Sequence, residues 1–148
     1  MPSYKIEEID LGNISKDVIN LFTDEAVNIQ LELNDKLPKV NADNSQVRRL
    51  LINLIRNSIQ AEASEIKLLI GCDDKFCNLS IEDNGQGISP EIRDKIFDQN
   101  FTTKSSGMGL GLKLAKRFLD GIGGDIQLIE SSKPGTTFKL LFPISQKK

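Results

Sequence analysis

The sequence predicts a two-layer α/β sandwich built on a mixed sheet. Strand-like alternation and helical periodicity follow one another along the chain, which is the pattern of packed sheet and helix layers. The 148 residues are enough for one buried core. Apolar residues make up 39% and charged residues 27%, as in ordinary globular domains. We therefore expect a single domain over residues 1–148, with a core at about 5–143 and a tail at 144–148.

The first third of the chain predicts a strand, a helix and a second strand. Residues 4–11 alternate imperfectly and suit an edge strand. Asn13 or Ser15 is a suitable cap for a helix that runs to about Val27. Residues 29–33 alternate cleanly and predict the second strand.

The longest helix is expected over residues 45–62, after a short pairing segment at 39–42. Asp43 or Ser45 would cap it. Asn53 and Asn57 lie four residues apart and share a face that borders its apolar stripe. On a 100° wheel the stripe consists of Val47, Leu50, Leu51, Leu54, Ile55 and Ser58.

The second half of the chain predicts four more strands and two helices. Residues 65–72 and 76–82 suit a hairpin, and Pro90 opens a short helix at 89–97. Residues 98–108 are polar, lack a period and predict a loop. A helix at 109–119 then ends at the glycines of 121–124, and strands follow at 125–130 and 136–143.

Composition and hydropathy exclude several classes of protein. The net charge of −2 does not suggest nucleic-acid binding. No run of about 18 apolar residues predicts a transmembrane helix, and the first residues lack the apolar core of a signal peptide. We expect a cytoplasmic, monomeric domain that contacts neither nucleic acid nor membrane.

The cysteine and histidine counts limit the chemistry. Cys72 and Cys77 flank a predicted turn, and we expect reduced thiols there. The chain has no histidine, so a zinc site or a Ser-His or Cys-His arrangement is not expected. Any histidine on which this domain acts lies on another domain or another chain.

Asn53 and Asn57 are the first candidate binding residues. A neutral carboxamide offers its oxygen to a hard cation such as Mg²⁺ without adding charge to a site that holds phosphate. The alternative is an ordinary polar helix face. Asparagine is a poor helix former, so two of them at this spacing favour a function.

The segment Asp83-Asn-Gly-Gln-Gly87 is the second candidate. It suits a turn that ends a strand, since Asn-Gly is a strong turn signal. The preceding strand would also place Asp83 where its carboxylate accepts a hydrogen bond from the amino group of a base. Gly85 and Gly87 would leave room for a flat ring.

The third candidate is the glycine-rich segment from Gly107 to Leu112, which begins a predicted helix. It is neither a P-loop nor a dinucleotide fingerprint. The N–H groups of a helix N-terminus can still cradle phosphate. Lys104 lies in the preceding loop and has two interpretations. It is either an ordinary solvated lysine or part of a lid that reaches the γ-phosphate of a nucleotide. Phe97 and Phe101 border the loop and suit hinge or core packing better than base stacking.

Together, these motifs resemble the four nucleotide-binding boxes of sensor histidine kinases. They occur in the same order: Asn53-x-x-x-Asn57 on a helix, Asp83-x-Gly-x-Gly after a strand, a loop bounded by Phe97 and Phe101, and glycines at a helix start. The resemblance covers about residues 6–143 and extends to the superfamily of gyrase B, MutL and the large heat-shock chaperones. The Thr-Thr-Lys and Asn-Ser-Ile-Gln-Ala segments are most similar to the nitrogen-regulator type.

The resemblance implies a Bergerat-type fold: a mixed, mostly antiparallel sheet covered on one face by about three helices. It implies ATP and Mg²⁺ as cofactors, with residues 98–108 as an ATP lid. Asn57, with Asn53 beside it, would bind Mg²⁺, Asp83 would read the adenine amino group, and Asn53, Asn57 and Lys104 would serve catalysis. Thr136 or Thr137 would support the adenine through water. Further nucleotide contacts would come from Gly85, Gly87, Ile88, Gly107, Gly109, Leu110, Gly111 and Leu112.

Two departures from the family pattern affect the expected function. Asn53 stands where ATP-hydrolysing relatives have a glutamate base, which favours transfer to another nucleophile over hydrolysis. Ala61 stands where the family has an aromatic residue, so one stacking contact is lost. The acceptor would be a histidine on a separate dimerisation hairpin, with a response regulator as an indirect partner. An anti-sigma-factor type of serine kinase and a nucleotide-binding module without transfer are the alternatives.

Overall fold

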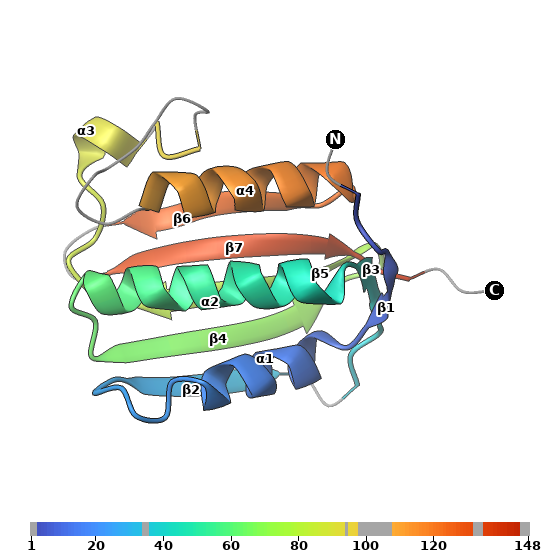
Figure 1. The fold of residues 1–148 in the computed structure, drawn as a ribbon, viewed down its shortest axis with the longest axis horizontal. Helices are drawn as coiled ribbons and strands as arrows, with labels where there is room; N and C mark the ends of the chain where they lie inside the picture. Colours follow the sequence, from blue (N-terminus) through green and yellow to red (C-terminus); the bar gives the residue numbers. More distant parts are fainter. Residues whose placement is uncertain (1–2, 34–35, 94, 98–107, 132–134, 146–148) are drawn as a thin grey trace.

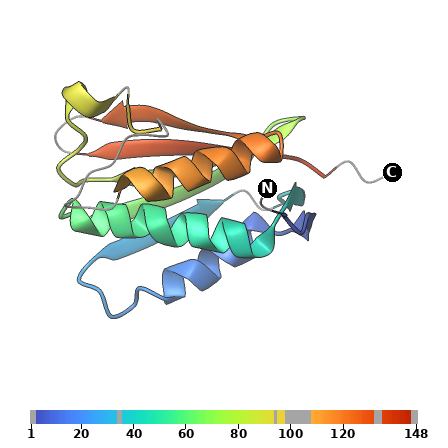
Figure 2. The same ribbon diagram turned by 45° about the horizontal axis from the view of Figure 1, so that its top comes forward.

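Three helices cover one face of a five-stranded sheet (Figure 1). The computed structural model describes residues 3–33, 36–93, 95–97, 108–131 and 135–145. Turning the molecule by 45° shows the helices on the same side of the sheet (Figure 2). The helices of this layer are α1 (Leu11–Asn20), α2 (Asn44–Gln60) and α4 (Met108–Gly121), and a short α3 (Pro90–Arg93) lies outside it.

The sheet is mixed and mostly antiparallel, which confirms the predicted fold class. Its order is β2-β4-β5-β7-β6, in which β2 and β4 are parallel and the other neighbours are antiparallel. The parallel pair requires a long crossover, and α2 lies in it. The strands are β2 (Asn28–Leu33), β4 (Glu65–Cys72), β5 (Phe76–Asp83), β6 (Asp125–Ser131) and β7 (Thr136–Pro143).

A second, two-stranded sheet holds the beginning of the described chain. β1 (Glu7–Ile9) pairs antiparallel with β3 (Val40–Ala42), and Val40 also forms a bridge with Ile144. Ile9, Val40 and Ala42 are buried. This confirms the brief pairing expected of residues 39–42, although the edge strand is shorter than the 4–11 alternation predicted.

The core lies between the sheet and the α2 stripe. The buried residues of β4 and β7 alternate with partly exposed ones, so each strand turns one face toward the helices. All six residues predicted for the stripe of α2 are buried, including Ser58. The periodicity therefore predicted the inward face of this helix correctly.

Several predicted helix boundaries were wrong by three residues or more. Asp10, whose carboxylate accepts from Asn13 N at 3.1 Å, caps α1 in place of Asn13 or Ser15. The helix stops at Asn20 because three-residue turns, such as that from Phe22 N to Ile19 O, lead the chain toward β2. The short helix α3 likewise ends at Arg93.

The prediction of reduced thiols is contradicted. The structure joins Cys72 and Cys77 in a disulfide that closes the β4–β5 hairpin. The two residues are direct cross-strand partners with Cα atoms 4.0 Å apart. This register brings the two sulfur atoms together, whereas the sequence showed only two cysteines five positions apart.

Asp43 joins the start of α2 to the N-terminal segment. Its Oδ1 accepts from Ser45 N at 3.0 Å, Ser45 Oγ at 2.8 Å and Gln46 N at 3.2 Å, and its Oδ2 accepts from Lys5 N at 2.8 Å. Burial by itself raises the pKa of this carboxyl, but the hydrogen bonds from Lys5, Ser45 and Gln46 outweigh it and hold the pKa below its usual value.

Asp43→Ala is expected to lower the free energy of unfolding by about 1–2 kcal/mol at pH 7. Because the folded-state pKa is lowered, this stabilisation is present above the unfolded pKa of about 4 and is lost as the pH falls through the folded pKa. Urea unfolding between pH 2 and 7 should therefore show a shallower acid slope for the variant. Asp10→Ala removes a helix cap that accepts only one hydrogen bond and is the matched control. It should lower the free energy of unfolding by less than Asp43→Ala does. Equal costs and equal slopes would contradict this role of Asp43.

Candidate nucleotide-binding site

Residues from distant segments meet at one end of the molecule. The C-terminal half of α2, the end of β5 and the start of α4 lie together at the left of Figure 1. They carry Asn57, Asp83 and Gly111, respectively. The chain therefore brings three of the predicted boxes to one edge of the helix layer.

Asp83 is held from two sides. Ser58 Oγ of α2 donates to Asp83 Oδ2 at 2.6 Å, and Gly85 N donates to Asp83 Oδ1 at 2.9 Å. A carboxylate has about four lone-pair positions, so acceptor capacity remains for a ligand amino group. The geometry is consistent with the predicted role of Asp83 as an acceptor.

The two threonines at the start of β7 lie on opposite faces of the sheet. Thr136 is directly opposite Asp83 in the β5–β7 register and is buried, with 7% of its surface exposed. Thr137 is opposite Glu82 and lies on the other face, because side chains alternate along a strand. The structure therefore places Thr136 beside Asp83 and not Thr137.

The turn after Asp83 is fixed to the neighbouring strand and helix. Asn84 Oδ1 accepts from Ser64 N at 2.9 Å and Glu65 N at 3.0 Å, and Gln86 N donates to Ala61 O at 2.9 Å. A Cβ at Gly85 would lie 2.7 Å from that same carbonyl oxygen, so a side chain does not fit there. Gly87 has a φ of 80°, which favours glycine.

Asn53 lies beside the start of α4, and Asn57 lies one turn further along the same face of α2. Both are partly buried, and neither side chain forms a hydrogen bond with another described residue. A Cβ at Gly111 would lie 3.5 Å from Asn53 Nδ2, which shows how closely the two helices approach. Among the described residues nothing occupies the amide oxygens, as a metal-binding role requires.

The remaining predicted residues fall into two groups. Ile88 and Leu112 are buried, and Gly109 and Leu110 belong to the first turn of α4. Lys104, Gly107 and Phe101 lie outside the described residues, as does most of the predicted lid at 98–108. Phe97 packs edge-to-face on Phe138 with ring centroids 6.4 Å apart, which confirms its predicted packing role.

Two residues at this site were not predicted to touch it. Ser58 was expected only as a member of the apolar stripe, yet its hydroxyl bonds Asp83. A buried hydroxyl needs a hydrogen-bond partner, so the presence of a serine in the predicted buried stripe already indicated such a partner, although not which one. Gly135 lies between the strands predicted at 125–130 and 136–143 and was given no role, but a Cβ there would lie 2.5 Å from Asp83 O. No sequence pattern links residues 52 positions apart.

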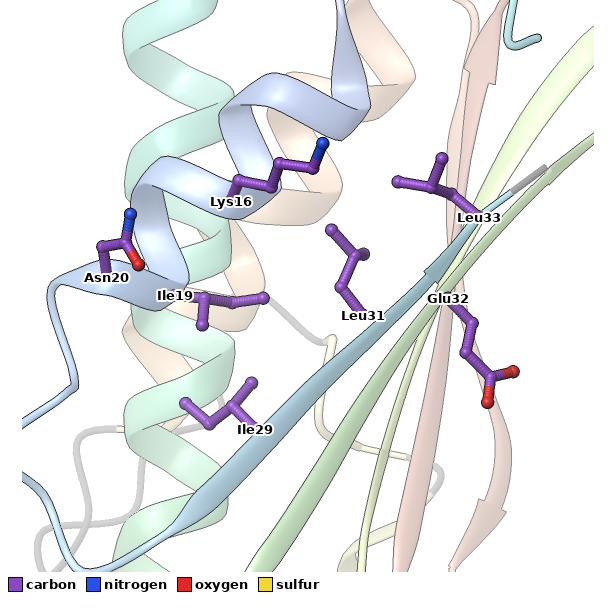
Figure 3. A pocket seen from close by; sticks show the side chains of 7 residues that line it. All are labelled: Lys16, Ile19, Asn20, Ile29, Leu31, Glu32 and Leu33. Atoms are coloured by element: carbon purple, nitrogen blue, oxygen red, sulfur yellow. The ribbon is translucent and has the colours of Figure 1, made fainter. Parts of the chain in front are cut away.

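A cavity away from these residues lies between α1 and the edge strand β2 (Figure 3). It measures about 510 Å³ and contains none of the predicted site residues. Ile19 of α1 and Ile29 and Leu31 of β2 point toward one another across it, whereas Glu32 points away. Its lining is Lys16, Ile19, Asn20, Ile29, Leu31, Glu32 and Leu33. Its lining mixes polar and apolar side chains, and it lies apart from the residues suited to phosphate and base.

Residues 42–146 match the model of a family described as histidine kinase-, DNA gyrase B-, and HSP90-like ATPase. The chain is 40% identical over 117 residues to the signal transduction histidine-protein kinase AtoS of Escherichia coli K12, a match that covers 77% of the chain and 19% of AtoS. It is 30% identical over 146 residues to the sensor histidine kinase ZraS of the same strain, with 95% and 31% covered. The chain thus spans less than a third of the length of these two relatives.

Solved structures show the same fold. A nucleotide-free form of the catalytic domain of histidine kinase ThkA superposes with a TM-score of 0.83 at 28% identity, and the match covers 95% of this chain and 98% of that domain. In the described part of the chain, no helix combines the length and apolar character needed to span a bilayer.

Proposed function

Because this chain belongs to the histidine kinase-, DNA gyrase B- and HSP90-like ATPase family, we propose that it holds ATP·Mg²⁺ for phosphoryl transfer to a histidine on another domain of its parent kinase. Its relatives AtoS and ZraS are named as histidine kinases. The observation that carries the proposal is the meeting of Asn57 and Asp83 at one end of the molecule. These residues suit the phosphate end and the base end of one nucleotide.

The base end is built around Asp83. Its carboxylate accepts from the exocyclic amino group of adenine, and Thr136 lies beside it in the β5–β7 register. Gly85 has no side chain, which leaves room for the base at a point where Ala61 O already lies close to the Gly85 backbone. In this proposal Gly87 and Ile88 line the same pocket.

The phosphate end fits a magnesium ion held jointly by nucleotide and protein. The described residues contain no group of three or more acidic, cysteine or histidine ligands, so a site built only from such side chains is not available there. Mg²⁺ is usually held by few protein ligands together with phosphate oxygens and water. Asn57, with Asn53 beside it, would supply the neutral oxygens, and the ion would neutralise charge on the phosphates. In this proposal the glycines of α4 shape the phosphate turn and Lys104 meets the γ-phosphate.

The acceptor lies outside these residues, since the chain contains no histidine. The contribution of the domain is positioning and charge neutralisation, which is how most phosphoryl transfer is catalysed. Asn53 offers no carboxylate to activate water, so hydrolysis by this chain should be slow. The partners would be a cytoplasmic helical hairpin that bears the histidine and, through it, a response regulator.

Calorimetry on the 148-residue chain tests the nucleotide site directly. The chain without substitutions should bind ADP and ATP, and Mg²⁺ should strengthen the binding of both nucleotides. Asp83→Asn should weaken ADP binding about tenfold, because an amide can present a donor to the amino group and leave a buried mismatch. Glu82→Gln is the matched control, since it makes the same change one residue earlier on the other face of the sheet. If the chain without substitutions binds no nucleotide at millimolar concentration, the proposal is refuted.

A further inference from the structure

Ser58 carries a buried hydroxyl whose hydrogen-bond acceptor, Asp83, belongs to the proposed base pocket. It lies on the inward stripe of α2 with only 4% of its surface exposed. Burying a hydroxyl without a hydrogen bond is costly. Its bond to Asp83 Oδ2, at 2.6 Å, is shorter than that of Gly85 N to Oδ1, at 2.9 Å. The serine therefore holds one carboxylate oxygen while the turn holds the other.

The two donors restrict the carboxylate to one orientation. Gly85 N comes from the turn that follows β5, and Ser58 Oγ comes from the helix that covers the sheet. With Ser58 removed, the hydrogen bond to Gly85 would remain and Asp83 Oδ2 would lose its partner. The acceptor directions presented to a base would then depend on one donor alone.

Ser58 also links the two ends of the proposed nucleotide site. It directly follows Asn57 on α2, so one rigid helix carries a phosphate-end residue and a base-end partner. We propose that Ser58 is a positioning residue that aims Asp83 at the 6-amino group of adenine and thereby sets base specificity. This inference rests on the proposed nucleotide site.

A purely structural role would have a different consequence. If Ser58 only tied α2 to β5, its loss would weaken binding of every nucleotide equally or change stability alone. If it aims Asp83, its loss should affect ligands that bear the amino group and spare those that lack it. IDP is a suitable probe, because it carries an oxygen where ADP carries the amino group.

The test measures the dissociation constants of ADP and IDP for Ser58→Ala in the 148-residue chain. ADP binding should weaken about five- to tenfold, the loss of one hydrogen bond to a charged group, and IDP binding should change less than about twofold. Ser58→Cys keeps nearly the same side-chain size but provides only a weak donor, so it should weaken ADP binding as Ser58→Ala does. Because it leaves no cavity, this second variant separates the lost hydrogen bond from an effect of the lost volume. In an Asp83→Asn background, Ser58→Ala should no longer change the ADP-to-IDP preference.

Ser45→Ala is the matched control, because it removes another serine-to-aspartate hydrogen bond from the same helix, at its far end. It should leave the ADP-to-IDP preference unchanged. Equal weakening of ADP and IDP by Ser58→Ala, or no change in either, would overturn the positioning role while leaving the nucleotide site intact. If the chain without substitutions binds neither nucleotide, the proposed site itself is overturned and this inference with it.

Discussion

Asn57→Ala is expected to reduce phosphoryl transfer by about 100-fold or more, which is the scale for removing one interaction that stabilises the transition state. The side chain of Asn57 forms no hydrogen bond with another described residue, and it lies one turn after Asn53, the α2 residue that approaches Gly111 of α4. Without it, the proposed magnesium ion would lose one of the two amide ligands assigned to it. The assay mixes the chain with the histidine-bearing hairpin of its parent kinase and follows acid-labile phosphohistidine.

The same variant should lose the strengthening of ADP binding by Mg²⁺, which calorimetry measures without any hairpin. It should remain folded, because alanine is a better helix former than asparagine and no hydrogen bond to a described side chain is broken. Asn78→Ala removes an amide from β5 far from the site and should change neither result. Unchanged transfer by Asn57→Ala would remove the metal role, and phosphoserine as the product would favour the serine-kinase alternative.

Gly135→Ala is expected to lower the free energy of unfolding by about 3 kcal/mol and to weaken ADP binding as well. Gly135 has a φ of 133°, a conformation that side chains rarely adopt. A Cβ there would lie 2.5 Å from Asp83 O, which is backbone and cannot move aside cheaply. Relief of that contact would displace the end of β5 and the carboxylate that it carries.

Gly123→Ala separates the two effects in this prediction. Gly123 has a φ of 84°, but a Cβ there would meet nothing within 4 Å. Its replacement should cost only the backbone strain, about 1–2 kcal/mol, and should leave ADP binding unchanged. Urea denaturation and calorimetry on both variants measure the two quantities. Similar costs for the two alanine variants would show that the contact with Asp83 is unimportant.

The sequence by itself determined the elements that depend on local patterns. The stripe of α2 could be predicted because a helix that buries one face must repeat apolar residues every three to four positions. The alternation of β4, β5 and β7 followed from the same requirement in strands. The candidate residues Asn57, Asp83 and Gly111 could be named because unusual residue types occur in a particular order. Their meeting at one end of the helix layer is a property of the fold.

Only the tertiary structure decided the interactions between distant segments. Ser58 and Asp83 are 25 positions apart, and no periodicity indicates that a serine in an apolar stripe meets this carboxylate. The disulfide of Cys72 and Cys77 depends on the hairpin register, which made the prediction of free thiols wrong. Thr136 and Thr137 are equivalent in sequence, and the β5–β7 pairing places one of them beside Asp83. Hydrogen bonds and close packing act over a few ångströms, so they depend on which segments the fold brings together, whereas sequence patterns record only which face each segment buries.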